Sequence, residues 1–98
     1  MLIVDEIKLS VCKTLKSLYG KDFSESDFQI NLTKPEFVGD YTVVLFALLK
    51  KVGKAPAVLG EELGNALLKE LPELFSGMNI IKGFLNLEIN NSYWQKFL

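Results

Sequence analysis

Apolar residues recur at intervals of three and four along the first segment of the chain. This spacing places one apolar stripe along the side of a helix, so the pattern predicts a helix that begins near Ile3 and ends at Gly20. The other side of this helix is charged or polar, as expected for a solvated face. The stripe consists of Ile3, Ile7, Val11, Leu15 and Leu18.

A strand pattern follows the first helix. Phe28, Ile30 and Leu32 alternate with polar residues, which predicts a half-buried strand over residues 28–32 after a turn at residues 24–27. Residues 33–40 then form a loop, because a proline disfavours helix at the residue before it and a glycine permits a sharp bend. The sequence therefore predicts a strand that ends in an eight-residue loop.

The run from residue 41 to residue 51 is apolar on nearly every side. We predict a deeply buried helix there, with Asp40 as the N-cap that accepts its free backbone amides. Gly53 ends this helix. Three lysines crowd its C-terminus, where positive charge complements the helix dipole: Lys50, Lys51 and Lys54.

Two prolines bound a third helix. Pro56 suits the first helical turn and Pro72 stops the helix, after which Leu74 and Phe75 pack in a short continuation. One side of this helix is apolar and another is acidic and polar. The pattern predicts an amphipathic helix that lies on the same core as the first.

The last third of the chain predicts a hairpin and one more helix. Residues 78–81 and 84–89 are strands joined through Lys82-Gly83, with Gly83 at the position that needs a positive φ. Asn91 or Ser92 caps a final helix that carries Tyr93, Trp94, Phe97 and Leu98. The sequence leaves open whether Trp94 packs inside the domain or forms a hinge to a following one.

The order of elements indicates the fold class. Helix, strand, helix, helix, strand, strand and helix place helices beside a small, mostly antiparallel sheet, which is an α+β sandwich of two layers. Ninety-eight residues suffice for a single domain. Because the chain ends in apolar and aromatic residues, we expect residues 1–98 to be the first domain of a longer protein, with residues 91–98 beginning the connection.

Composition narrows the possible chemistry. The chain has no histidine and one cysteine, Cys12, so most catalytic and zinc-binding templates are excluded, and a binding module is favoured over an enzyme. The net charge is −1, and all basic residues are lysines. Any nucleic-acid binding must therefore be local and lacks the bidentate fork of arginine.

The expected setting is the cytoplasm. No basic segment precedes an apolar run at the N-terminus, so we predict no signal peptide. The longest apolar run, residues 43–49, is far shorter than the roughly 20 residues that a membrane span needs. A reducing compartment also suits Cys12 as a small apolar filler.

The loop that precedes residue 41 contains the side chains with the clearest candidate binding function. It presents Lys34, Phe37, Asp40 and Tyr41 around a proline and a glycine. An exposed aromatic ring is a surface on which an unpaired base can stack, and a neighbouring carboxylate can read a base edge. The structural alternative is that Phe37 and Tyr41 belong to the core and that Asp40 is only a cap.

Several segments together resemble one family. They are Phe37-Val38-Gly39-Asp40-Tyr41, the apolar helix ending Lys50-Lys51-Val52-Gly53-Lys54, Pro56 at the next helix, and Gly83-Phe84-Leu85-Asn86-Leu87. Their order and spacing resemble the N-terminal additional domain of arginyl-tRNA synthetases, over nearly the whole chain. The chain departs from the family where Val38 separates the aromatic residue from the glycine, and where Thr42-Val43-Val44 replaces an early threonine and asparagine.

The resemblance implies a tRNA-binding appendage that contacts the D-loop at the elbow of tRNA-Arg. It makes Phe37 the stacking platform and Asp40 the polar reader, with Lys34 and Tyr41 beside them. We add Lys50, Lys51 and Lys54 as phosphate contacts, expected near the same loop. Other expectations concern the parent protein, which would be a monomer and use ATP and Mg to join arginine to tRNA in a separate catalytic domain of the same chain. The present domain would hold neither cofactor nor catalytic residues.

Two other functions compete with tRNA binding. A small α+β protein-interaction domain would use the apolar surplus and Trp94 at an interface with another chain. A small hydrolase would use paired carboxylates such as Glu36 and Asp40, although nothing in the sequence supplies a partner base. An exposed apolar patch without a basic rim would favour the interaction domain.

Overall fold

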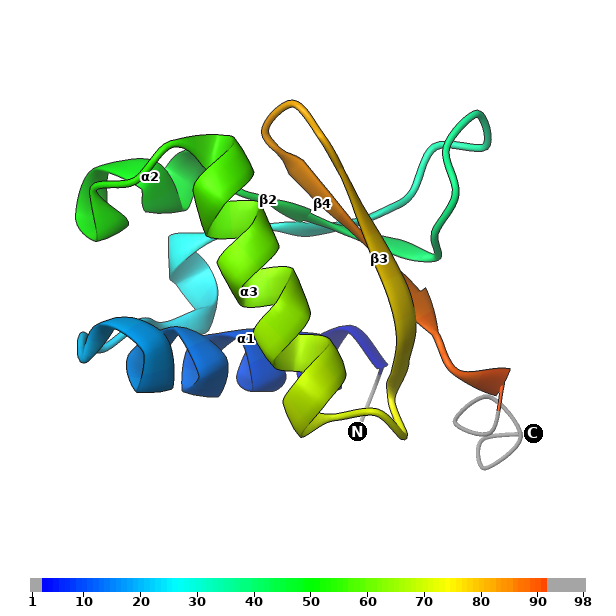
Figure 1. The fold of residues 1–98 in the computed structure, drawn as a ribbon, viewed down its shortest axis with the longest axis horizontal. Coiled ribbons are helices and arrows are strands. Elements are labelled where there is room, and N and C mark those ends of the chain that lie inside the picture. Colours follow the sequence, from blue (N-terminus) through cyan, green and yellow to red (C-terminus); the bar gives the residue numbers. More distant parts are fainter. Residues whose placement is uncertain (1–2, 92–98) are drawn as a thin grey trace.

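The computed structural model describes residues 3–91, which form helices and one antiparallel sheet (Figure 1). The strand order is β1-β2-β4-β3. The α+β prediction is confirmed. The elements are α1 (Ile3–Tyr19), the short 3₁₀ turn η1 (Glu25–Asp27), β1 (Ile30–Leu32), β2 (Tyr41–Val44), α2 (Phe46–Val52), α3 (Pro56–Glu70), β3 (Phe75–Ile81) and β4 (Phe84–Ile89).

The two long helices lie where the sequence predicts them. Gly20 follows α1 with φ 67°, and Gly53 caps α2 in the left-handed region with φ 75°. Pro56 stands in the first turn of α3. None of the helices within residues 3–91 combines the length and the apolar character needed to cross a membrane.

The helix predicted from residue 41 is wrong over its first turn. Residues Tyr41–Val44 are strand β2, which pairs with β1 on one side and β4 on the other, and α2 begins only at Phe46. Thr42 and Val43 at the centre of this strand are buried, so its mostly apolar run has the same appearance as a buried helix. The β-branched residues Thr42, Val43 and Val44 favour the strand.

Asp40 is therefore not a helix cap. The N-cap of α2 is Leu45, which makes no side-chain capping bond. The Asp40 carboxylate instead accepts a hydrogen bond at Oδ2 from the backbone N–H of Ile89, at 2.8 Å. This contact continues the β2–β4 pairing beyond Tyr41, so Asp40 holds the start of β2 against the end of β4.

Smaller corrections concern the other strands. Phe75 begins β3 instead of continuing α3, and a bulge between Phe75 and Gly77 shifts the β3–β4 register. In the turn between these strands Lys82 has the positive φ of 56°, whereas the sequence assigned it to Gly83. β1 begins at Ile30, two residues later than predicted. The predicted terminal helix with Trp94 falls in residues 92–98, outside the described part of the chain.

The core lies between the sheet and the long helices. α1 and α3 cover one face of the sheet, and the Thr33–Asp40 loop extends beyond the sheet on the other side of the molecule (Figure 1). We call the face away from α1 and α3 the outer face. The fully buried core side chains include Ile7, Val11, Leu15, Val43, Leu59, Leu63, Leu67, Leu85 and Leu87.

Candidate nucleic-acid interface

A row of polar residues crosses the outer face of the sheet. The strand register places Asn31 opposite Thr42, Thr42 opposite Asn86, and Asn86 opposite Asn79, so every strand contributes one. Val43 and Leu85 alternate with them and point into the core. Alternation therefore puts a polar stripe at right angles to the strands.

Hydrogen bonds join most of this row into what we call the polar ladder: Thr33, Thr42, Asn86 and Asn79. Thr42 Oγ1 donates to Asn86 Oδ1 at 2.5 Å, and Asn86 Nδ2 donates to Asn79 Oδ1 at 3.0 Å. Since the Thr42 proton is used there, Thr33 Oγ1 donates to Thr42 Oγ1 across 2.9 Å. The bonds fix which end of the Asn86 amide is oxygen and which is nitrogen.

The polar ladder also fastens the Thr33–Asp40 loop to the sheet. Asn79 Nδ2 donates to the carbonyl of Val38 at 2.6 Å, and the backbone N–H of Asp40 donates to Leu87 O at 2.8 Å. Gly39 between them has φ 139°, and a Cβ there would lie 3.1 Å from Asn86 Cβ. The loop thus follows a path that only glycine permits at this position.

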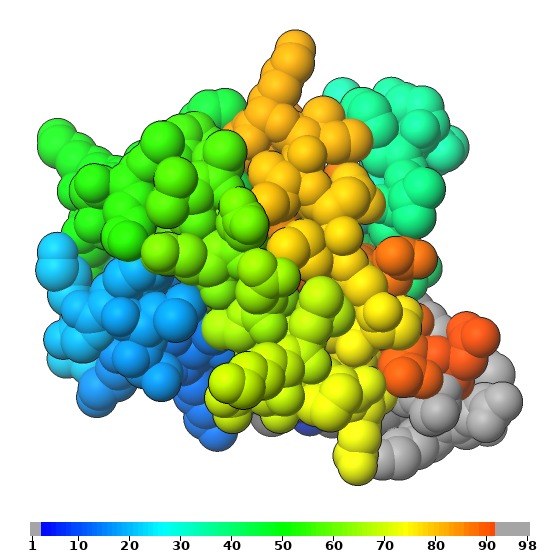
Figure 2. All heavy atoms as spheres, in the orientation of Figure 1, coloured from blue at the N-terminus to red at the C-terminus, as the bar shows by residue number. Residues whose placement is uncertain are grey.

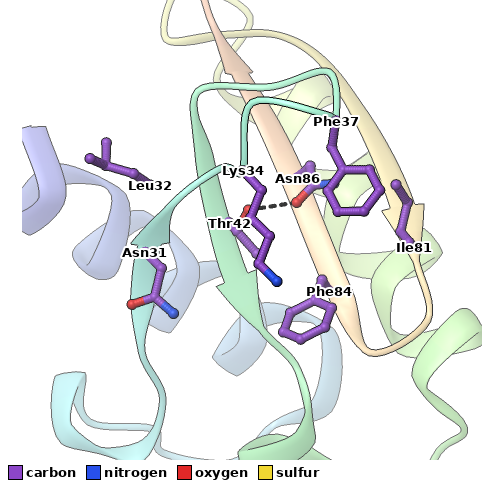
Figure 3. A pocket seen from close by; sticks show the side chains of 8 residues that line it. All are labelled: Asn31, Leu32, Lys34, Phe37, Thr42, Ile81, Phe84 and Asn86. Atoms are coloured by element: carbon purple, nitrogen blue, oxygen red, sulfur yellow. Dashed lines mark hydrogen bonds between the residues drawn. The ribbon is translucent and has the colours of Figure 1, made fainter.

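The loop and the sheet enclose a pocket on the outer face. Figure 3 shows Phe37 reaching from the loop over Asn86, Lys34 extending toward the middle of the pocket, and Phe84 on the opposite side. Thr42 and Asn86 are buried at its floor, whereas Phe37 and Phe84 are 37% and 38% exposed. The pocket is lined by Asn31, Leu32, Lys34, Phe37, Thr42, Ile81, Phe84 and Asn86.

Aromatic surface continues from the pocket toward α2. The ring of Phe46 meets the ring of Phe84 edge to face, with centroids 5.8 Å apart and planes at 88°. Phe46 is 55% exposed. Gly83 lies directly beneath the Phe46 ring, which occupies the space that a Cβ at residue 83 would need. The hairpin glycine is thus required for the approach of this ring.

The residues predicted from the loop occupy three different environments. Lys34 and Phe37 line the pocket, as a binding role requires. Asp40 lies at the base of the loop with one carboxylate oxygen on the Ile89 amide. Tyr41 is half-buried and packs against the core, as the structural alternative proposed for it.

Asp40→Ala is expected to destabilise the fold by about 1.5–3 kcal/mol, because the backbone amide of Ile89 loses a charged acceptor. Asp40→Asn keeps an acceptor oxygen and should recover most of that loss. Urea unfolding of the two variants measures both effects. Equal destabilisation by alanine and asparagine would show that the Asp40–Ile89 bond does not carry this stability.

The predicted proximity of the three lysines to the loop is wrong. Because residues 41–44 form a strand, β2 carries the chain away from the loop, and α2 lies at the other end of the molecule in Figure 1. Lys51 Nζ donates to the carbonyl of Asp22 and lies 4.5 Å from the centroid of the Phe23 ring. Lys50 is exposed at the same end. Whether these lysines contact RNA stays a prediction.

Lys54 belongs to a polar contact between α1 and α3. Its Nζ lies 3.1 Å from Glu62 Oε1, which also accepts a hydrogen bond from the Tyr19 hydroxyl at 2.7 Å. Burial, and then the bond to Glu62, raise the pKa of Tyr19, while that same bond lowers the pKa of Glu62. The arrangement ties the end of α1 to α3.

Sequence reasoning missed the sheet's own contribution to the pocket. Phe84 and Asn86 alternate with apolar residues in β4, so both point to the outer face beside Thr42. An asparagine inside a strand, two residues after a phenylalanine, was the available signal. Within residues 3–91, no group of three or more cysteine, aspartate or glutamate side chains is placed to hold a metal ion.

Comparison with known proteins places the chain in a family. It matches the family described as arginyl tRNA synthetase N terminal domain over residues 5–89. The chain belongs to this family. The resemblance inferred from the sequence motifs is thereby confirmed, and the match includes both the Thr33–Asp40 loop and the β3–β4 hairpin.

Relatives of this family member are named arginine–tRNA ligases. That of Phocaeicola vulgatus is 39% identical over 98 residues, and that of Bacteroides thetaiotaomicron is 40% identical over the same length. The solved arginyl-tRNA synthetase of Thermus thermophilus superposes with a TM-score of 0.78 over 98% of this chain, at 24% identity, which supports the fold. The chain spans about 16% of the length of the curated ligases.

Proposed function

We propose that this chain is the tRNA-binding domain of an arginine–tRNA ligase and that it contacts the D-loop at the elbow of tRNA-Arg. Its membership in the N-terminal domain family and the name of its relatives support this proposal. The remainder of the ligase would join arginine to tRNA with ATP and Mg. In this proposal the domain adds affinity and orientation, acts as part of a cytoplasmic monomer, and has the catalytic domain of the same chain as its second partner.

The outer-face pocket is the observation that carries the proposal. Two partly exposed rings, Phe37 and Phe84, face a pocket whose floor is made of hydroxyl and amide groups. An unpaired base can stack on such a ring while its edge meets polar side chains. Lys34 at the same pocket supplies a positive charge for the phosphate of that nucleotide.

Groups of the pocket differ in how they can meet a base edge. Asn86 is 2% exposed and already bonds to Thr42 and Asn79, so it shapes the floor. Asn31 is exposed at the rim on β1 and offers both an amide donor and an acceptor. We assign the exposed base contact to Asn31 and the fixed floor to Asn86.

An NMR titration of the labelled chain tests the proposal. A tRNA-Arg transcript is added at low and moderate salt, and a duplex of equal charge serves as the control. Shifts with tRNA but not with duplex, confined to the loop, Asn31, Thr42, β4 and the β3–β4 turn, are the expected result. A chain that shows no shifts with millimolar tRNA at either salt would contradict the proposal and favour a protein-interaction domain.

Phe37→Ala is expected to weaken tRNA binding by about 1–2 kcal/mol, or about 5- to 30-fold, because a stacking surface is lost. The ring is 37% exposed, so the stability loss should stay well below the about 3–5 kcal/mol of a buried phenylalanine. Binding and urea unfolding are measured on the same variant. Val58→Ala, an exposed apolar residue on α3, is the control and should leave binding unchanged.

A further inference from the structure

The turn between β3 and β4 contains a lysine in an unfavourable backbone conformation. Lys82 has φ 56°, in the left-handed region that glycine, asparagine and aspartate occupy more readily. Two-residue hairpin turns favour those residues for the same reason. A lysine at this position lowers the stability of the turn, and an unfavourable residue at an exposed position points to a function of its side chain.

The neighbouring residues explain why the turn is tight. Gly83 lies under the Phe46 ring, and its carbonyl accepts a hydrogen bond from the backbone N–H of Leu45 at 2.9 Å. Residue 83 is therefore held at the start of α2, and the chain reverses its direction at Lys82 beside it. The turn projects from the upper edge of the molecule in Figures 1 and 2.

Lys82 also differs from Lys51 and Lys54, the lysines near the end of α2. Lys51 and Lys54 form ion pairs with Asp27 and Glu62. Among the residues that the structure describes, the exposed Lys82 side chain has no hydrogen bond or ion pair. Its charge is therefore available to a ligand without breaking a contact of the fold.

The position of the turn relates Lys82 to the outer-face pocket. Ile81 and Phe84, which flank the turn, both line the pocket. Lys34 enters the pocket from the Thr33–Asp40 loop, which is held at the opposite end of β4 by the Asp40 contacts with Leu87 and Ile89. The turn that contains Lys82 and the loop that contains Lys34 thus lie at the two ends of the aromatic surface.

We propose that Lys82 binds a phosphate of the RNA strand, on the side of the pocket opposite Lys34. This inference rests on the proposed function, and it extends the RNA site from the loop to the β3–β4 turn. The strand would cross the outer face with one nucleotide stacked on Phe84 and with lysines at the preceding and following phosphates.

Three variants of the 98-residue chain test the inference with a tRNA-Arg transcript as the probe. Lys82→Asn removes the charge and suits the left-handed φ, so the melting temperature should hold or rise while affinity falls about three- to tenfold. The slope of log K against log salt should fall by about one. Lys82→Arg keeps the charge and should bind like the wild type.

Lys13→Gln removes an equal charge from α1 and is the matched control. Unchanged affinity and salt slope in Lys82→Asn would overturn the Lys82 contact while leaving the proposed function intact. An equal loss in Lys13→Gln would overturn it as well, because the effect would then reflect net charge. Failure of the wild-type chain to bind the transcript would overturn both the proposed function and this inference.

Discussion

Gly39→Ala is expected to destabilise the protein by about 2–5 kcal/mol. A φ of 139° lies in a region that is open almost only to glycine, and the added methyl would crowd Asn86 and Thr33. Both costs apply together, since relieving the φ would pull the loop away from the sheet. The free energy of unfolding in urea measures the effect.

Gly20→Ala is the matched control for this prediction. Gly20 also has a positive φ, 67°, but a Cβ there meets no atom within 4 Å. The Gly20→Ala substitution should therefore lower the free energy of unfolding only by the left-handed strain, about 1–2 kcal/mol. Similar losses at the two positions would show that backbone strain alone, and not the approach of Gly39 to Asn86, decides the cost.

Phe84→Ala is expected to produce the largest loss of tRNA binding, about 2–3 kcal/mol, or about 30- to 150-fold. Phe84 stands on a paired strand and has its ring oriented by Phe46, so little ordering is needed when a base stacks on it. Phe37 stands on the Thr33–Asp40 loop, which supports its ring less than a paired strand supports the ring of Phe84. Titration with a tRNA-Arg transcript measures the difference.

Phe84→Tyr is the companion variant, because it retains the aromatic face and should retain most of the binding. Leu18→Ala removes a comparably exposed apolar side chain from α1 and should have no effect on binding. If Phe84→Ala kept an intact fold and bound tRNA with wild-type affinity, the sheet would not be part of the RNA site. Phe37 and the loop would then have to account for the stacking by themselves.

Local signals sufficed for the elements that sequence reasoning placed correctly. The period of α1 and the terminators Gly20, Gly53 and Pro72 act within a few residues of the chain, and α1 and α3 follow them. The β2 strand could not be distinguished from a helix in this way. Its place in the sheet depends on pairing with β4, about forty residues away in the chain.

The candidate site was predicted in part for the same reason. Lys34 and Phe37 share a loop, so their proximity is visible in sequence. Phe84 and Asn86 reach them only through the β2–β4 register, which a single sequence does not display. Asp40 accepts a hydrogen bond from a backbone amide of β4 instead of capping a helix, because the element that follows it is a strand.

The polar ladder has a consequence for how the sheet opens. β1–β2 and β3–β4 are separate hairpins along the chain, joined through the pairing of β2 with β4. Side-chain bonds from Thr33 to Asn79 run across that junction and return to the loop at Val38. Because these bonds link the two hairpins, we expect them to open as one cooperative unit with a common protection against hydrogen exchange.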